Sequence, residues 1–179
     1  YQSPTRYLPD RYTFYGATLE DAPMIVHLLN LRHFNPAPFR VEDLRSEWQV
    51  AGFNPAMDVR LVFDPREQLV GFIQVSMEKK HPFLWGCVHP DFEGRGIGSA
   101  LLCWGEARVR FELDEPPVRF WPAPRFAALP VQKAHELCEN LGWRQITPQK
   151  KEMKRVTGAL HLPEEAAQAV DVFEKVFEH

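Results

Sequence analysis

Apolar residues in the first third of the chain recur at helical spacing. Two groups show this spacing: Met24, Ile25, Leu28 and Leu29, and then Val41, Leu44 and Trp48. Residues three and four apart share one face of a helix, so each group predicts an amphipathic helix. Thr18, followed three residues later by Asp21, has the pattern of a capping box and marks the start of the first helix.

The middle of the chain changes to short β-rich runs. Two such runs flank "DPREQ" at residues 64–68, which predicts a hairpin. A third run, "FLWGCV" at residues 83–88, ends at His89-Pro90. A helical pattern then extends from about Ile97 to about Leu113, so three consecutive strands followed by a helix are expected.

The second half of the chain predicts further strands and helices. Residues 118–121, "VRFW", form a predicted short strand, and residues 131–142 a helix whose C-cap is Gly142. Residues 143–156 predict one or two last strands, and residues 162–179 a final helix. The order β-α-α-β-β-β-α-β-α-β, with one added helix, predicts an α/β fold in which helices cover the faces of a mixed sheet.

Length and composition set limits on this picture. The 179 residues fit one domain, 45% of them are hydrophobic, and residues 1–10 predict an irregular arm. A net charge of −3 gives no reason to expect nucleic acid or a membrane as a partner, and no apolar run approaches the roughly 20 residues that span a bilayer. Cys87, Cys103 and Cys138 form no CxxC pair, so we expect no metal site and a reducing, cytoplasmic environment.

The segment "VHPDFEGRGIGSALL", residues 88–102, carries the clearest chemical pattern. Glycines at every second position before a helix expose backbone amides and let an anion approach, which predicts a pyrophosphate site. A dinucleotide fingerprint, GxGxxG or GxGxxA, would need Gly or Ala at position 99 or 101, where the chain has Ser99 and Leu101. A nucleotide P-loop would need Lys followed by Ser or Thr after the last glycine, and this pair is missing. The alternative is a tight bend between a strand and a helix, with no ligand.

These residues resemble the acyl-CoA loop of the GNAT acetyltransferases, whose segment reads V-x-P-x-x-Q/R-x-x-G-x-G/A. Glu93 stands where that family usually has Gln or Arg. "AHELCENLGW", residues 134–143, is similar to the second family signature, with Cys138 in the tyrosine position and Trp143 in place of Phe. The resemblance covers about residues 12–157.

The resemblance implies a GNAT fold, with a mixed, mostly antiparallel central sheet flanked by helices. Residues 11–157 would form the acetyltransferase domain. Residues 158–179 would add an extra C-terminal helix, as a linker or a docking element.

The resemblance also implies that acetyl-CoA is the co-substrate. The backbone of Cys87 and Val88 would pair with the pantetheine arm, and the Val88 N–H would polarise the thioester carbonyl. Six residues would hold the pyrophosphate: Gly94, Arg95, Gly96, Ile97, Gly98 and Ser99.

The acid and the base of the reaction each have candidates, and each candidate has a structural alternative. Cys138 could donate a proton to the leaving thiolate, or it packs on the apolar face of its helix. Glu78, His81 and His89 are candidates for the base, but the first two flank a turn and the third precedes a proline. Trp85 could line the acceptor pocket or belong to the core.

Three functions follow. The first is an N-acetyltransferase acting on the amine of a small molecule or a protein. The second is a non-catalytic CoA-binding module, or one half of a tandem GNAT protein, which Glu93 and Cys138 would favour. The third, a nucleotide-binding protein, fits the glycine spacing poorly.

The acceptor pocket is expected in residues 30–55 and 120–132, with Trp48, Phe53, Trp121 and Phe126. The acceptor itself and the oligomeric state, a homodimer included, stay open.

Overall fold

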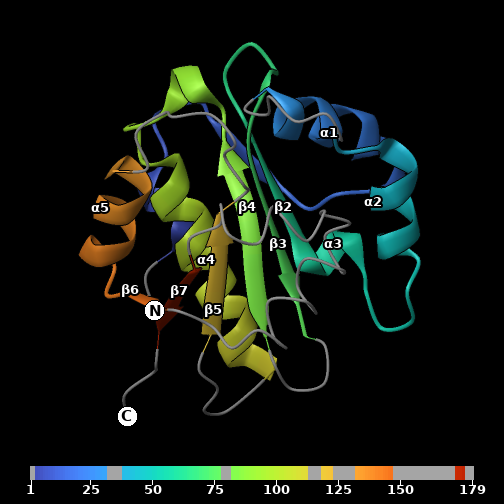
Figure 1. Ribbon diagram of the computed structural model, residues 1–179. Helices are drawn as coiled ribbons and strands as arrows, with labels where there is room; N and C mark the ends of the chain where they lie inside the picture. The colour runs from blue at the N-terminus through green and yellow to red at the C-terminus, as the bar shows by residue number, and fades with distance from the viewer. Residues whose placement is uncertain are drawn as a thin grey trace.

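A seven-stranded sheet forms the centre of the computed structural model, which describes residues 3–31, 38–77, 82–112, 118–122, 132–146 and 172–175. The strand order is β1-β2-β3-β4-β5-β7-β6, and helices lie on both faces (Figure 1). The strands are β1 Thr13–Tyr15, β2 Val59–Phe63, β3 Leu69–Ser76, β4 Phe83–Val88, β5 Val118–Pro122, β6 Arg144–Ile146 and β7 Val172–Lys175. The helices are α1 Ala22–Asn30, α2 Val41–Trp48, α3 Pro55–Asp58, α4 Ile97–Glu112 and α5 Gln132–Asn140, with short 3₁₀ turns η1 Pro4–Tyr7, η2 Leu19–Asp21 and η4 Pro90–Phe92.

Pairing in this sheet is mostly antiparallel, as expected. Strands β1 to β4 form an antiparallel meander, β5 runs parallel to β4, and β7 is antiparallel to both β5 and β6. The predicted hairpin joins β2 and β3, and its turn is held by Asp64, whose Oδ1 accepts the amides of Arg66 and Gln68 at 2.9 Å each. An aspartate is suited to this turn because its short side chain reaches backbone amides two to four residues ahead.

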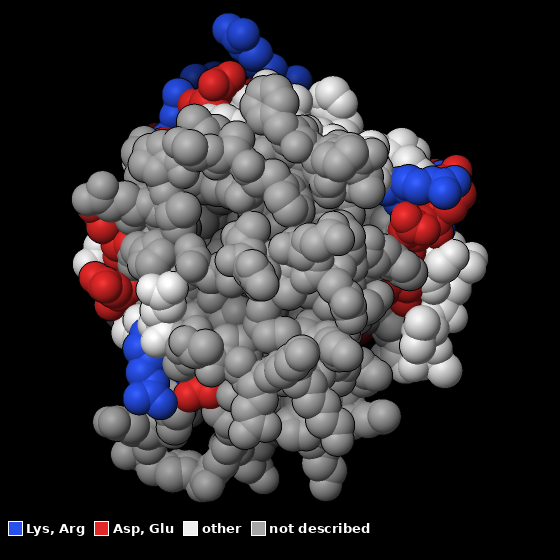
Figure 2. Space-filling view, in the orientation of Figure 1, with Lys and Arg blue, Asp and Glu red and all other residues white. Residues whose placement is uncertain are grey.

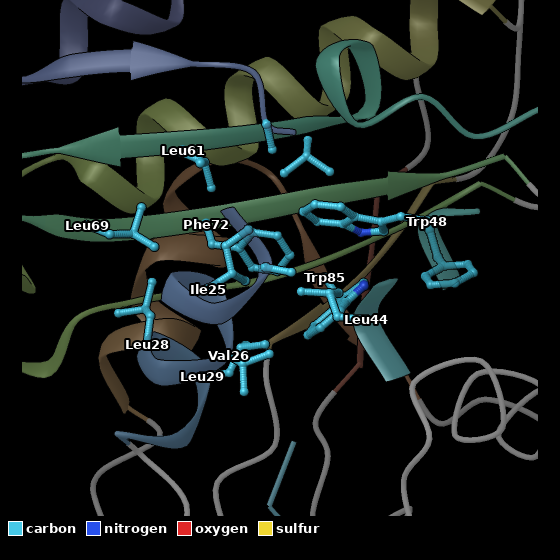
Figure 3. Packing of buried hydrophobic residues seen from close by; sticks show 14 residues of the cluster. Ile25, Val26, Leu28, Leu29, Leu44, Trp48, Leu61, Leu69, Phe72 and Trp85 are labelled. Atoms are coloured by element: carbon cyan, nitrogen blue, oxygen red, sulfur yellow. The ribbon is translucent and has the colours of Figure 1, made fainter. Parts of the chain in front are cut away.

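The core has two halves, one on each face of the sheet. Helices α1 and α2 cover one face with a cluster that includes Ile25, Leu44, Phe72 and Trp85 (Figure 3). Helix α4 covers the other face, where Leu84, Ile97 and Leu102 are among the buried residues. Strand β3 is buried along almost its whole length because helices cover both of its sides.

Several predicted helix ends are confirmed. The Thr18 amide donates to Asp21 Oδ2 at 2.8 Å, as the capping box required. Helix α4 begins at Ile97. Helix α5 ends in a Schellman motif, with Gly142 at a φ of +83° and the Trp143 amide donating to the Cys138 carbonyl at 2.8 Å.

The two chain ends differ from the prediction. The arm is not irregular throughout, since Pro4–Tyr7 form η1, in which Pro4 is buried. The predicted final helix is wrong over Val172–Lys175, which form β7 inside the sheet. Pairing with a strand on each side outweighs the local helical pattern. The other residues of that helix, and of the strand predicted near 150–156, lie outside the described residues.

No described helix combines the length and the apolar character needed to cross a bilayer.

Candidate functional site

Strand β4 pairs in parallel with β5. The last pairs among the described residues are Trp85 with Trp121 and Gly86 with Pro122. On the other side of β4 the ladder continues, since the His89 amide donates to the Val70 carbonyl at 2.8 Å. Antiparallel ladder bonds involve every second residue, so the amide of Val88 points away from β3, toward the side of β5. The end of β4 therefore directs a backbone donor toward the side of β5, two residues beyond the last described pair.

The glycine segment leads from β4 into α4 through η4. The first helical bond runs from the Ala100 amide to the Gly96 carbonyl at 3.0 Å. The amides of Ile97, Gly98 and Ser99 precede that bond, so they have no acceptor within the helix. Together with the helix dipole they form a site suited to an anion.

The three glycines of this segment have different surroundings. Gly94 has a φ of +75°, and a β-carbon there would meet no heavy atom within 4 Å. Gly96 has a φ of +87°, and a β-carbon there would overlap the carbonyl of Tyr7 in η1. A β-carbon at Gly98 would lie 2.6 Å from Cδ2 of Leu137 on α5. Only Gly94 faces open space, so a ligand can approach closely there, whereas the other two make room for the protein itself.

Arg95 is exposed and is held by two aromatic residues. Its Nη1 donates to the Tyr12 hydroxyl at 3.3 Å, and its guanidinium carbon lies 4.7 Å above the Phe92 ring centre. Around the rim of the face in Figure 2, basic and acidic side chains of described residues lie next to one another. Arg95 thus places a positive charge near the start of α4.

Cys138, the candidate acid, is completely buried on α5. Burial raises the pKa of its thiol to about 12 because the thiolate would lose its hydration. A thiol in this state holds its proton more tightly than an ordinary thiol, whose pKa is about 8.5. The position therefore favours packing over proton donation.

The candidate bases occupy different environments. His89 caps η4, since its Nδ1 accepts the Asp91 amide at 3.1 Å, and its Nε2 lies 3.4 Å from Gln68 Nε2. These contacts favour a structural role for this ring. Glu78 and His81 lie outside the described residues. Among the residues that the structure does describe, no group of three or more His, Cys, Asp or Glu side chains could hold a metal ion.

Glu47, at the end of α2, was not among the sequence candidates. Its Oε1 accepts a 2.7 Å hydrogen bond from Nε2 of Gln74 on β3, and the Gln74 Oε1 in turn accepts from Trp48 Nε1 at 2.9 Å. Burial raises the pKa of Glu47 to about 7, and the Gln74 hydrogen bond opposes that rise. Its position three residues after Leu44 places it at the border of the apolar face of α2, the one sequence signal that could have identified it.

Trp85 lies next to this group, on β4. The ring is 1% exposed, stacks on Phe39 with centres 5.8 Å apart and meets the edge of Phe72 at 5.2 Å. Its indole N–H is the one buried side-chain donor of the described residues that has no acceptor. Trp48 and Phe53, expected near the acceptor, stack at 6.3 Å, whereas the side chain of Trp121 and all of Phe126 lie outside what the structure describes.

Comparison with known proteins gives one family. Residues 22–115 match the model of the acetyltransferase (GNAT) family. No curated protein sequence matches the chain.

Solved structures share the fold. A GCN5-related N-acetyltransferase from Sphaerobacter thermophilus is 24% identical, with a TM-score of 0.65 over 78% of this chain and 45% of its own longer chain. A phosphinothricin acetyltransferase from Sinorhizobium meliloti in complex with acetyl-CoA is 15% identical, with a TM-score of 0.62 over 93% of this chain and 89% of that one. The PaiA N-acetyltransferase from Thermoplasma acidophilum in complex with coenzyme A is 12% identical, with a TM-score of 0.61 over 93% and 99%. Because these three structures are less than 25% identical to this chain, the similarity shows a shared fold and nothing further.

Proposed function

This chain belongs to the acetyltransferase (GNAT) family, and from that premise we propose that it transfers an acetyl group from acetyl-CoA directly to an amine of a small molecule or a protein. The observation that carries the proposal is a pair of backbone features at one end of the sheet. The Val88 amide points to the side of β5, beyond the last described β4–β5 pair, and the amides at the start of α4 follow a few residues later. A strand edge and a helix start so close in sequence suit an extended ligand that ends in a diphosphate.

The described residues fit acetyl-CoA. The diphosphate would lie against the amides of Ile97, Gly98 and Ser99, with Gly94 leaving room and Arg95 adding charge. In this proposal Gly96 and Gly98 contribute through backbone shape, because their missing side chains are replaced by Tyr7 and Leu137. The backbone of Val88 would pair with the pantetheine arm. The N–H and C=O of Cys87 face β3, as those of His89 do, so the expected contribution of the Cys87 backbone is not supported.

The chemistry needs three contributions from the protein. Acetyl-CoA supplies an acetyl thioester, and the Val88 amide would donate to the thioester carbonyl, where negative charge develops. A neutral amine forms the new C–N bond while the C–S bond breaks, and the proton that the nitrogen loses neutralises the departing thiolate. Solvent can deliver that proton, so the buried Cys138 is not required.

The test is the release of free CoA thiol from acetyl-CoA in the presence of amino acids, polyamines, aminoglycosides and N-terminal peptides. We expect at least one amine to raise thiol release above the rate without amine, together with an N-acetylated product of the right mass. Binding of acetyl-CoA by calorimetry without turnover of any amine would support the second candidate, a CoA-binding module, which the burial of Cys138 favours. The absence of acetyl-CoA binding would refute both.

A further inference from the structure

A chain of hydrogen bonds fixes one carboxylate on the face of the sheet that α1 and α2 cover. Gln74 is buried, and its amide is used at both ends, as donor to Glu47 and as acceptor from Trp48. The orientation of Gln74 is therefore determined, and it holds Oε1 of Glu47 in place. No described residue donates to the other carboxylate oxygen of Glu47, which leaves that oxygen available to a bound cation.

The sheet register locates this group. Gln74 on β3 lies opposite Trp85 on β4, and Trp85 lies opposite Trp121 on β5. The last described β4–β5 pair, Gly86 with Pro122, follows one residue later. The side chain of Trp85 belongs to the core of the α1–α2 face, and Cys87 packs against the same cluster. The carboxylate is thus held by the row of the sheet that precedes the last described β4–β5 pair and lies three residues before Val88.

The indole of Trp85 adds a donor in the same row. A buried N–H without an acceptor is unfavourable, and an oxygen atom of a bound molecule would satisfy it. The surrounding rings of Phe39 and Phe72 cannot accept a conventional hydrogen bond, so the missing acceptor has to come from outside the described residues.

We infer that Glu47, positioned by Gln74, binds the ammonium group of the acceptor and takes its proton, while the Trp85 N–H donates to an oxygen of the same acceptor. The inference rests on the proposed function. The acceptor is then a primary amine that carries a hydroxyl, ether or carbonyl oxygen near its nitrogen. The carboxylate takes one proton from R–NH₃⁺ to leave R–NH₂, the amine forms the amide bond as the C–S bond breaks, and Glu47 later returns its proton to water.

The acid–base properties of Glu47 agree with this role. A pKa of about 7 lets the carboxylate accept a proton from a bound ammonium and release it to water near neutral pH. The other titratable or charged groups on the packed elements are Glu42, Asp43 and Arg45 on α2, His27 on α1 and Cys87 on β4, and β3 has no charged side chain. The two causes of the shifted Glu47 pKa are burial and the Gln74 hydrogen bond, and neither is a neighbouring charge. Among substitutions in this region, those of Glu47 and Gln74 should therefore change the pH dependence of kcat/KM the most.

The experiment compares two primary amines that differ in one atom, 2-methoxyethylamine and butylamine, by thiol release across pH. Glu47→Gln keeps the size of the side chain and an oxygen for Gln74, so it should fold, which its melting temperature would check. We expect it to lower kcat/KM for both amines by about 100-fold or more and to remove the acidic limb near pH 7. Glu42→Gln, an exposed carboxylate of the same helix, is the matched control and should change neither.

Trp85→Phe tests the oxygen. It should lower kcat/KM by about tenfold for the ether amine and much less for butylamine, because only the former loses a hydrogen bond. Acetyl-CoA affinity, measured by calorimetry, should stay the same in Glu47→Gln and Glu42→Gln, since the diphosphate site lies at the start of α4.

Every outcome is informative. Turnover by the wild type with an unchanged pH profile and kcat/KM in Glu47→Gln would overturn the inference and leave the proposed function intact. If neither amine is turned over, calorimetry of the two amines in the presence of CoA tests the subsite by itself. Binding that Glu47→Gln abolishes would support the ammonium subsite and refute acetyl transfer to these amines. The absence of binding would overturn the subsite.

Discussion

Replacing each glycine of the loop by alanine should separate the three roles that the structure gives them. All three substitutions add the same β-carbon within five residues of one another. At Gly94 the new atom enters open space, at Gly96 it meets the backbone carbonyl of Tyr7, and at Gly98 it meets the end of the Leu137 side chain. A loop in which every glycine existed only to admit a ligand would show no such differences in stability.

The expected losses follow from these contacts. Gly94→Ala suffers only the left-handed backbone conformation, about 1–2 kcal/mol of unfolding free energy. Gly96→Ala has the same strain and must also displace η1, and overpacking of this kind adds about 1–3 kcal/mol, so the total is about 2–5 kcal/mol. Gly98→Ala meets a side chain that can rotate, and alanine gains up to about 1 kcal/mol of helix propensity, so its loss should be the smallest or vanish.

Urea unfolding of the three variants measures these losses, and a double-mutant cycle isolates the contact with η1. Deleting residues 3–8 removes the Tyr7 carbonyl, so Gly96→Ala in the shortened chain should lose only the strain. We expect a coupling free energy of about 1–3 kcal/mol between the deletion and Gly96→Ala, and none for Gly94→Ala. Equal losses at Gly94 and Gly96, or a coupling below about 0.5 kcal/mol, would refute the placement of the arm on the loop.

Three further outcomes are expected. By calorimetry, Gly94→Asp should bind acetyl-CoA about 5-fold to 100-fold more weakly than Gly94→Asn. Aspartate and asparagine both tolerate positive φ, so the variants differ in one negative charge beside the diphosphate. Equal affinities would mean that the diphosphate lies elsewhere. Cys138→Ser should destabilise the protein by about 1–3 kcal/mol in urea unfolding through a buried hydroxyl and leave the pH–rate profile unchanged, whereas a shifted basic limb would restore the thiol as the acid. The raised pKa of Glu47 means that the folded state favours its protonated form, so the stability this group contributes is full below pH 4.5 and is lost as pH rises through about 7. Thermal melts of Glu47→Gln should lack that decline, and identical pH dependence in both proteins would contradict the burial of the carboxylate.

Most of the fold could be predicted from local patterns. The hairpin around Asp64, the start of α4 at Ile97 and the Gly142 cap each depend on a few neighbouring residues whose chemistry allows one conformation. Strand β7 could not be predicted this way, because Val172–Lys175 become a strand through pairing with β5 and β6, which are distant in sequence.

The site shows the same division. The glycine pattern predicted a loop between β4 and α4, and the structure has one there. The pattern could not reveal that Tyr7 and Leu137 occupy the space beside Gly96 and Gly98, since both contacts come from other segments. Glu47 could not be predicted as a site residue from the sequence, because a glutamate on an amphipathic helix is usually solvated. Its distinction lies in Gln74 on β3, which the sequence does not connect to α2.

Strand β7 also constrains the order in which the protein can be completed during synthesis. The ribosome delivers residues 172–175 after every other described strand, yet their place is between β5 and β6. Among the described strands β6 pairs only with β7, so until that segment emerges β6 has no edge to join. Helix α5, which precedes β6 and brings Leu137 against Gly98, then lacks its anchor in the sheet. A nascent chain that has already formed β1 to β4 and α4 therefore lacks one wall of the glycine loop until residues 172–175 emerge, and a ligand of that loop cannot stabilise the chain before then.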